Sequence, residues 1–338
     1  MAQMQRTWLA HSRPRFRTRR ILAALWHRLD PLALELVADV MHRGANLLFL
    51  GARDQPQRGP NTGRTHTADG SFQQLVEDEV SRGWLAPFSL QLPCPELFVA
   101  PLDIMPKSDG SFRLTDNLSY AGDGTSVNGA TAATKDAFCS FDDFACAFLR
   151  IGRTAVFLKL DFKTAYRQVW LKFGGVTSVC AASTLRAAAT YTWRLTLGYG
   201  HKAACNRWLL VANCFRALVE AHAASDPGSF AQALNDCFLW VDDLIRARNS
   251  WAEALWAREI CLRVAELDGF DLSPPKLSAS VISEFTGITV DAPALLFSVR
   301  PATRAKSLSW RSSLSCRPQR RGPSGTCSAW RATTTASP

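Results

Sequence analysis

Two adjacent aspartates, Asp242 and Asp243, interrupt an otherwise apolar stretch that runs from Phe238 to Ile245. Apolar residues on both sides of the pair predict a β-hairpin whose tip carries the two carboxylates. An ordinary turn would tolerate such a pair, yet two neighbouring carboxylates repel each other. A bound metal ion would resolve that repulsion, so the stretch predicts either a plain turn or one part of a metal site.

A third aspartate, Asp161, supplies a second part of such a site. It follows the apolar residues 156–160, which predict a short buried strand. Magnesium prefers carboxylate oxygens, and the ends of adjacent strands hold carboxylates at a fixed separation. Phosphoryl transfer onto a nucleic-acid end uses two such ions about 4 Å apart. Asp161 could instead cap a helix over 163–172, but the three aspartates taken together favour a metal site.

The composition is that of a globular protein with a sizeable core, because 47% of the 338 residues are hydrophobic and 20% are charged. No apolar run approaches the roughly 18–20 residues that a membrane-spanning helix needs, so we expect no membrane partner. Hydrophobic periodicity predicts helices over 31–43, 72–82 (capped by Ser71), 203–224 and 251–267. It predicts strands over 97–106, 112–115, 156–160, 177–182, 189–197 and 295–299.

The net charge of +10 is unevenly distributed along the chain. Seven arginines precede the first acid, Asp30, and eight basic residues follow the last acid, Asp291. These two arms hold 15 of the 39 basic residues, so the part between them carries 24 basic against 29 acidic residues. Basic arms suit contact with nucleic-acid phosphates, although a solvated tail would have the same composition.

The ten cysteines are scattered along the chain and include no Cys-x-x-Cys pair. Such usage indicates free thiols in a reducing compartment. We therefore expect an intracellular protein, with nucleus and cytoplasm equally compatible.

Six short motifs follow one another along the chain, over residues 106–113, 117–128, 158–166, 239–243, 269–276 and 284–288. Asp161 is followed by an aromatic residue five positions later, and an aromatic residue stands two positions before the Asp-Asp pair. The two aspartate motifs are separated by 81 residues, counted from Asp161 to Asp242. In this order and at this interval the motifs resemble those of a retrotransposon reverse transcriptase, and the motif over 117–128 is similar to the DIRS-like group.

The resemblance covers residues 71–297 and implies an α+β fold, the fingers and palm of a right-hand polymerase. An antiparallel palm sheet with packed helices would carry the three aspartates. The implied organisation is a basic arm with a short helix and a linker (1–70), a fingers-like region (71–155), a palm (156–297) and a basic tail rich in Ser and Arg, expected to be disordered (298–338). Nothing after Val299 resembles a thumb, so we expect the thumb to be absent or incomplete.

The resemblance also implies roles for individual residues. Asp161, Asp242 and Asp243 would hold two Mg²⁺ ions, or Mn²⁺, and Lys276 would act as a general acid. Lys107 and Arg113 would neutralise a deoxynucleoside triphosphate. The remaining substrate-contacting positions would be Phe162, Tyr166 as a gate against the ribose 2′-hydroxyl, and Gly198 as a point of close backbone approach. An RNA template and a DNA primer would be the partners, and the oligomeric state is left open.

Each of these side chains also has an ordinary structural interpretation. Lys107, Arg113 and Lys276 would serve equally as exposed charges, Tyr166 as a core aromatic residue and Gly198 as a turn glycine. Residues 197–204 keep a glycine but lack the usual Ala-Pro of the family, and Trp240 replaces its usual aromatic residue. A catalytically inactive retroelement remnant that binds nucleic acid is therefore the alternative to an active RNA-directed DNA polymerase. A receiver-type phosphotransferase also uses paired aspartates, but it predicts a repeating βα pattern that this sequence does not show.

Overall fold

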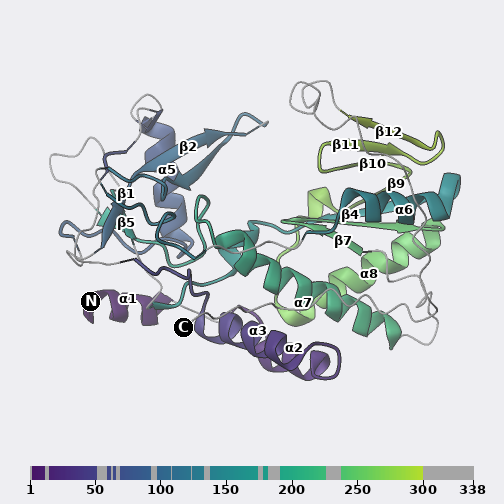
Figure 1. Ribbon diagram of the computed structural model, residues 1–338, viewed down its shortest axis with the longest axis horizontal. Helices are drawn as coiled ribbons and strands as arrows, with labels where there is room; N and C mark the ends of the chain where they lie inside the picture. Colours follow the sequence, from purple (N-terminus) through teal and green to yellow (C-terminus); the bar gives the residue numbers. More distant parts are fainter. Residues whose placement is uncertain are drawn as a thin grey trace.

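A computed structural model describes residues 2–11, 15–51, 59–61, 64–65, 69–92, 97–107, 109–122, 124–132, 138–173, 178–181, 191–225 and 237–299. Figure 1 shows two groups of elements, one around α5, β1, β2 and β5 and the other around β4, β7, α6 and α8. The predicted tail after Val299 lies outside the described residues, as do parts of the predicted linker. Among the described residues there is no thumb-like unit, which agrees with the expectation from the sequence.

A four-stranded sheet, which we call the palm sheet, has the order β7-β8-β4-β9. Its strands are β4 (Val156–Asp161), β7 (Cys237–Trp240), β8 (Asp243–Arg248) and β9 (Ser278–Ser280). Every neighbouring pair in the palm sheet is antiparallel. This arrangement confirms the predicted α+β class and excludes the repeating βα units of a receiver domain.

The two faces of the palm sheet are covered by different elements. Because successive strand residues point to opposite faces, Leu158 and Leu160 of β4 join the core formed with helices α7 (Ala204–Ala224) and α8 (Trp251–Asp268). Phe157 points the other way and packs against Phe144 and Phe148 of α6 (Phe141–Ile151). That second core also includes residues of a small sheet of β10 (Ile282–Phe285), β11 (Ile288–Asp291) and β12 (Leu296–Val299).

Most of the other group of elements lies within residues 71–155, the range expected for the fingers, but two strands from the expected palm range also join it. It contains α5 (Asp69–Ser81), the antiparallel hairpin of β2 (Leu102–Pro106) and β3 (Phe112–Asp116), and a sheet of β1 (Phe98–Ala100), β5 (Ser178–Ala181) and β6 (Tyr191–Thr192). The single strand predicted over 97–106 is wrong, because it divides at Pro101. Proline has no N–H to give to a strand ladder, which explains the break.

Three further predictions differ from the structure. Helix α5 begins at Asp69, so Ser71 lies inside the helix rather than at its cap. Only the short 3₁₀ turn Ala165–Gln168 forms within 163–172, where a helix capped by Asp161 was the alternative. Of the described residues in the strand predicted over 189–197, only Tyr191–Thr192 forms a strand, although Arg194 and Thr196 make isolated bridges.

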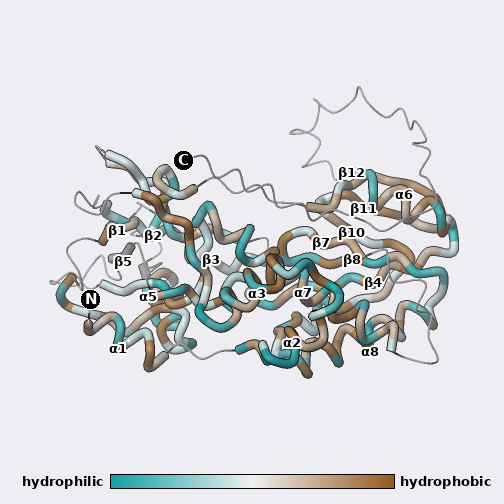
Figure 2. Tube along the Cα trace, turned by 60° about the horizontal axis from the view of Figure 1, so that its bottom comes forward, coloured by the Kyte–Doolittle hydropathy of each residue, from teal (hydrophilic) through white to brown (hydrophobic). Residues whose placement is uncertain are grey.

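The N-terminal region contains two helices that the sequence did not predict, α1 (Ala2–His11) and α2 (Thr18–Leu25), in addition to the predicted α3 (Pro31–Arg43). Asp30 caps α3 by accepting hydrogen bonds from the N–H groups of Leu32 and Ala33. Helix α2 packs against α7 and α8 through side chains such as Ile21 and Leu25, which are fully buried. Side chains of residues 16–43 thus contribute to the palm core. Figure 2 shows α2 lying beside α7 and α8.

None of the helices in the described part of the chain has the length and apolar character needed to cross a bilayer.

Candidate active site

The three aspartates lie at one edge of the palm sheet. Asp161 is the last residue of β4 and pairs in register with Asp243, the first residue of β8. Asp242 occupies the two-residue turn between β7 and β8, directly beside that pair. The hairpin predicted from the sequence is present, and residues 81 positions apart in the chain meet at its tip.

The turn that carries Asp242 is held in an unusual backbone conformation. Val241 has a φ of 55°, in the left-handed region that a β-branched residue rarely adopts. Two hydrogen bonds fix the turn: Trp208 Nε1 donates to the Val241 carbonyl over 2.6 Å, and the Phe162 N–H donates to the Asp242 carbonyl over 2.9 Å. The position of Asp242 is therefore set by the conformation of the turn together with the core residues that hold it.

Two lysines compensate part of the negative charge. The Lys276 ammonium lies 3.1 Å from each oxygen of the Asp161 carboxylate. Lys159 Nζ lies 3.4 Å from Asp243 Oδ1 and also donates to the Glu284 carbonyl. Lys276 extends from the 3₁₀ turn Pro274–Lys276, and its side chain remains largely exposed. The structure thus brings Lys276 to the aspartates, and adds Lys159, which no sequence motif indicates.

Burial and the neighbouring negative charges raise the pKa values of two of the carboxyl groups. Burial raises the pKa of Asp161; the contact with Lys276 opposes this shift, and the charges of Asp242 and Asp243 add to it. The pKa of Asp242 is also raised, first by burial and then by Asp243, against the weaker effects of Lys276 and Arg113. For Lys276, burial is outweighed by the hydrogen bond and charge of Asp161, so its pKa is raised.

No group of three or more His, Cys, Asp or Glu side chains within the described residues is arranged closely enough to hold a metal ion as it stands. The donor set nevertheless has the chemistry that Mg²⁺ requires, since three carboxylates share one sheet edge. A divalent cation would relieve their repulsion. Lys276, which contacts the Asp161 carboxylate, would then have to move aside.

The fingers hairpin places its two basic residues in different surroundings. Arg113 belongs to β3 and its guanidinium lies 4.4 Å from the ring centroid of Tyr199. Its charge acts on Asp242, which links the hairpin to the aspartates. Lys107 is exposed in the turn between β2 and β3, where its N–H and carbonyl hydrogen-bond Ser111 and Gly110.

The two aromatic candidates are buried to different degrees. The Phe162 ring is 1% exposed and packs edge-on against Trp208 and Phe215. Its side chain is therefore part of the core that supports the site, and it is not exposed to a substrate. Tyr166 is half-buried on the core, and its ring centroid lies 5.3 Å from that of Tyr199. Burial raises the pKa of Tyr166, with contributions from Cys205 and from the charge of Asp242, which places its hydroxyl in the field of the site.

Gly198 has a close neighbour, but that neighbour is protein. A Cβ atom at Gly198 would lie 2.2 Å from Asp116 Oδ2, and one at Gly200 would lie 2.0 Å from the Asp116 carbonyl oxygen. The space beside Gly198 is thus filled by the Asp116 carboxylate, which favours the structural interpretation of this glycine.

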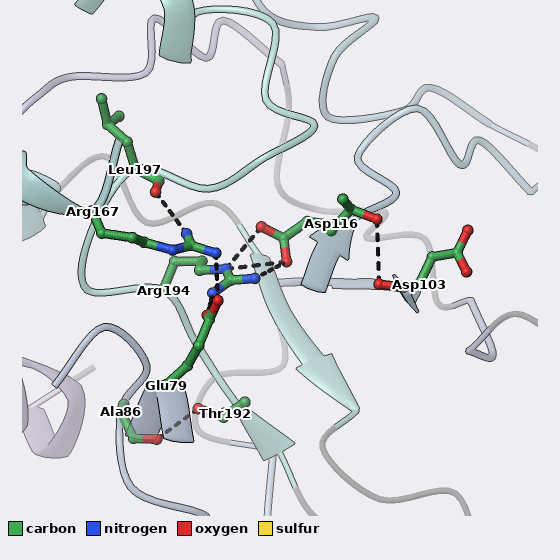
Figure 3. A network of polar contacts seen from close by, with 9 residues as sticks. Glu79, Ala86, Asp103, Asp116, Arg167, Thr192, Arg194 and Leu197 are labelled. Atoms are coloured by element: carbon green, nitrogen blue, oxygen red, sulfur yellow. Dashed lines mark hydrogen bonds and ion pairs between the residues drawn. The ribbon is translucent and has the colours of Figure 1, made fainter. Parts of the chain in front are cut away.

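A buried network of charges surrounds that contact, and the sequence analysis did not find it (Figure 3). Arg194 binds both Asp116 and Glu79, while Arg167 donates to Glu79 and to the Leu197 carbonyl. We call Glu79, Asp116, Arg167 and Arg194 the buried charge network. It joins α5 and β3 of the fingers to the turn that follows Asp161 in the palm.

No known sequence family matches the chain, and no curated protein does. Solved structures do match. The chain is similar to the foamy viral protease-reverse transcriptase in complex with double-stranded DNA, with a TM-score of 0.54 and 14% identity over 88% of this chain and 49% of that one. Its similarity to the native Prototype Foamy Virus protease-reverse transcriptase has a TM-score of 0.51 and 17% identity, over 76% of this chain and 29% of that one.

A third match, the foamy viral protease-reverse transcriptase in complex with an RNA/DNA hybrid, has a TM-score of 0.52 and 13% identity, over 86% of this chain and 36% of that one. This chain spans about half of these proteins or less. Identities this low bear on the fold alone. The chain therefore has a reverse-transcriptase-like polymerase fold, with its three aspartates at one edge of the palm sheet.

Proposed function

We propose that the chain is the fingers-and-palm part of a retrotransposon reverse transcriptase, possessing RNA-directed DNA polymerase activity. The observation that carries the proposal is the register of the palm sheet, which pairs Asp161 with Asp243 and sets Asp242 beside them. Polymerisation needs carboxylates fixed at one place to receive a primer end and a triphosphate. The matched structures include complexes with double-stranded DNA and with an RNA/DNA hybrid, which supports an RNA template and a DNA primer as partners.

Each residue of the site would have its own role in catalysis or in nucleotide binding. Asp161 and Asp242 would hold two Mg²⁺ ions, with Asp243 assisting, and Mn²⁺ could substitute. Such ions lower the pKa of the primer hydroxyl and neutralise the leaving pyrophosphate. Lys276, which contacts Asp161 and has a raised pKa, is protonated at neutral pH and can donate a proton to the pyrophosphate. Arg113 and Lys107 would bind the phosphates of the incoming deoxynucleotide.

Primer extension on an RNA template, with Mg²⁺ and deoxynucleoside triphosphates, tests this proposal. We expect the natural chain to extend the primer and Asp242→Asn to reduce extension to background. Asp142→Asn is the matched control, because it removes the same charge from an exposed position in the first turn of α6. An equal loss of primer extension in both variants, or no loss in Asp242→Asn, would contradict the assignment.

Ribonucleotides in the same assay test the proposed sugar gate. We expect Tyr166→Ala to increase ribonucleotide incorporation relative to deoxynucleotide incorporation, because the ring that would meet the 2′-hydroxyl is gone. If the folded natural chain extends nothing but binds an RNA/DNA hybrid, the alternative of an inactive nucleic-acid-binding remnant takes the place of the polymerase.

A further inference from the structure

The ring of Tyr199 lies among three charged or aromatic side chains near the aspartates. The guanidinium of Arg113 lies 4.4 Å from its centroid and that of Arg167 lies 5.0 Å from it. The ring of Tyr166 is 5.3 Å away, at an interplanar angle of 43°. Both guanidinium distances are within the range of an attractive cation–π contact.

Arg167 is the fixed partner in this arrangement. Its side chain is fully buried; Nη2 donates to Glu79 and Nη1 donates to the Leu197 carbonyl, each over 2.7 Å. Glu79 in turn binds Arg194, which binds Asp116, so the buried charge network immobilises the guanidinium (Figure 3).

The main chain of Tyr199 is fixed as well. Its carbonyl accepts a hydrogen bond of 2.9 Å from the Asp116 N–H. Gly198 and Gly200, on either side, approach Asp116 so closely that a Cβ atom on either would collide with it. Tyr199 therefore has little freedom to shift relative to the network.

Arg113, by contrast, extends from β3 as an exposed side chain. Within the described part of the chain its guanidinium makes no hydrogen bond or ion pair, so the Tyr199 ring is its principal support. An arginine without such support loses rotamer freedom only when a ligand binds, and that loss weakens binding.

We propose that Tyr199 is a positioning residue: its ring holds the Arg113 guanidinium toward the aspartates, ready for the phosphates of the incoming nucleotide. Through Tyr199 the buried charge network, which touches no substrate, would set the affinity for deoxynucleoside triphosphates. This inference rests on the proposed function for its consequence, while the contact itself stands on the geometry.

Steady-state titration of one deoxynucleotide in the primer-extension assay tests the consequence. Because a cation–π contact corresponds to about 3- to 30-fold in a binding constant, we expect Tyr199→Leu to raise KM for the nucleotide by that factor. We expect kcat to remain within about twofold, since the aspartates are untouched. Tyr199→Phe keeps the ring, so KM and kcat should equal those of the natural chain. If the effect of Tyr199→Leu came from the lost hydroxyl, Tyr199→Phe would raise KM as well.

Coupling between variants identifies the partner. Arg113→Ala with Tyr199→Leu should raise KM no more than Arg113→Ala alone, whereas Lys107→Ala with Tyr199→Leu should multiply the two single effects. Arg82→Ala is the matched control, because Arg82 is also exposed and lies 5.0 Å from an aromatic centroid, that of Trp84. We expect it to leave KM unchanged. A multiplicative effect with Arg113→Ala, or a Tyr199→Phe variant that behaves like Tyr199→Leu, would overturn the inference.

Thermal unfolding separates this inference from the proposed function. If the natural chain extends no primer, the polymerase assignment fails, but the Arg113–Tyr199 contact can still be judged. If the contact exists, the unfolding midpoint of the double variant should shift by less than the sum of the shifts of Arg113→Ala and Tyr199→Leu. Additive shifts would refute the contact, whatever the activity.

Discussion

The imidazole of His201 lies buried just before α7, where its Nδ1 accepts a hydrogen bond of 3.1 Å from the Ala203 N–H. Burial lowers the pKa of His201 to about 4, and the charge of Asp116 opposes this shift only in part. In an unfolded chain the histidine pKa is about 6.5. Between these values the unfolded state binds more protons than the folded one, so folding stability falls as the pH falls.

We therefore predict that acid destabilises this protein between about pH 6.5 and pH 4. The full difference in pKa corresponds to roughly 3 kcal/mol, lost progressively across that window. Chemical denaturation at a series of pH values measures it. His201→Asn keeps an acceptor for the Ala203 N–H but does not titrate, so its stability should change less over the same window; an identical slope would contradict the prediction.

Single residues also show what a sequence can and cannot reveal. The meeting of Asp161, Asp242 and Asp243 was predictable because the aspartates adjoin apolar runs, and that pattern is local. Gly198 was predicted to let the template or the nucleotide approach the backbone closely, but the structure fills that space with the Asp116 carboxylate, which no local pattern indicates. The contacts of Tyr199 carried no signal, because its neighbours Arg113 and Arg167 are distant in the chain.

At the scale of elements, the buried charge network joins α5 to β3 and to the turn after Asp161. Glu79 is its shared carboxylate, because it binds both Arg167 and Arg194. Removing one member of a buried ion pair leaves an uncompensated charge, which costs about 3–5 kcal/mol. We predict a loss of that size in the free energy of unfolding for Glu79→Gln, measured by chemical denaturation.

Glu77→Gln is the matched control, since Glu77 lies on the exposed side of the same helix, where it accepts a hydrogen bond from Gln73. A surface change of this kind should stay within about 0.5 kcal/mol. Equal losses for the two variants would mean that the network contributes no more than an ordinary surface contact.

The elements themselves were predictable where their signals were local. Helix α3 carries Asp30 as its cap, Pro31 at its first position and Gly44 just past its end, and its boundaries were predicted correctly. Helix α2 was missed because its buried apolar face consists chiefly of Ile21 and Leu25, directly after the two arginines of its first turn. The network was beyond prediction because 78 to 115 residues separate Arg194 from its two carboxylate partners.

At the scale of the whole molecule, the segment from Phe16 to Arg43 packs into the palm core rather than extending from it as an arm. Phe16, Ile21 and Leu25 lie in the same core as α7 and α8, and Arg20 forms an ion pair with Asp268. We predict that deletion of residues 1–29 lowers the free energy of unfolding by about 5 kcal/mol or more, because each of those three apolar side chains contributes roughly 1.5–3 kcal/mol.

Two point variants separate the contribution of apolar packing to the free energy of unfolding from that of a basic side chain. Ile21→Ala should lower stability by about 2–4 kcal/mol, as for other buried aliphatic side chains, while Arg19→Ala, on the exposed side of the same helix, should not. If Arg19→Ala weakens binding of an RNA/DNA hybrid and reduces its salt dependence, the region also contacts phosphates. A stable, fully folded deletion variant would show that α2 is dispensable to the palm.

The left-handed Val241 at the hairpin tip has a consequence for any attempt to engineer this chain. Glycine adopts that conformation at far lower cost than a β-branched residue, so a mutant library screened for heat resistance should enrich Val241→Gly. A glycine would also free the turn to take other shapes and loosen the placement of Asp242. A screen for nucleotide incorporation should therefore discard Val241→Gly, which the screen for heat resistance favours. At residue 241, selection for thermal stability and selection for catalytic rate would act in opposite directions.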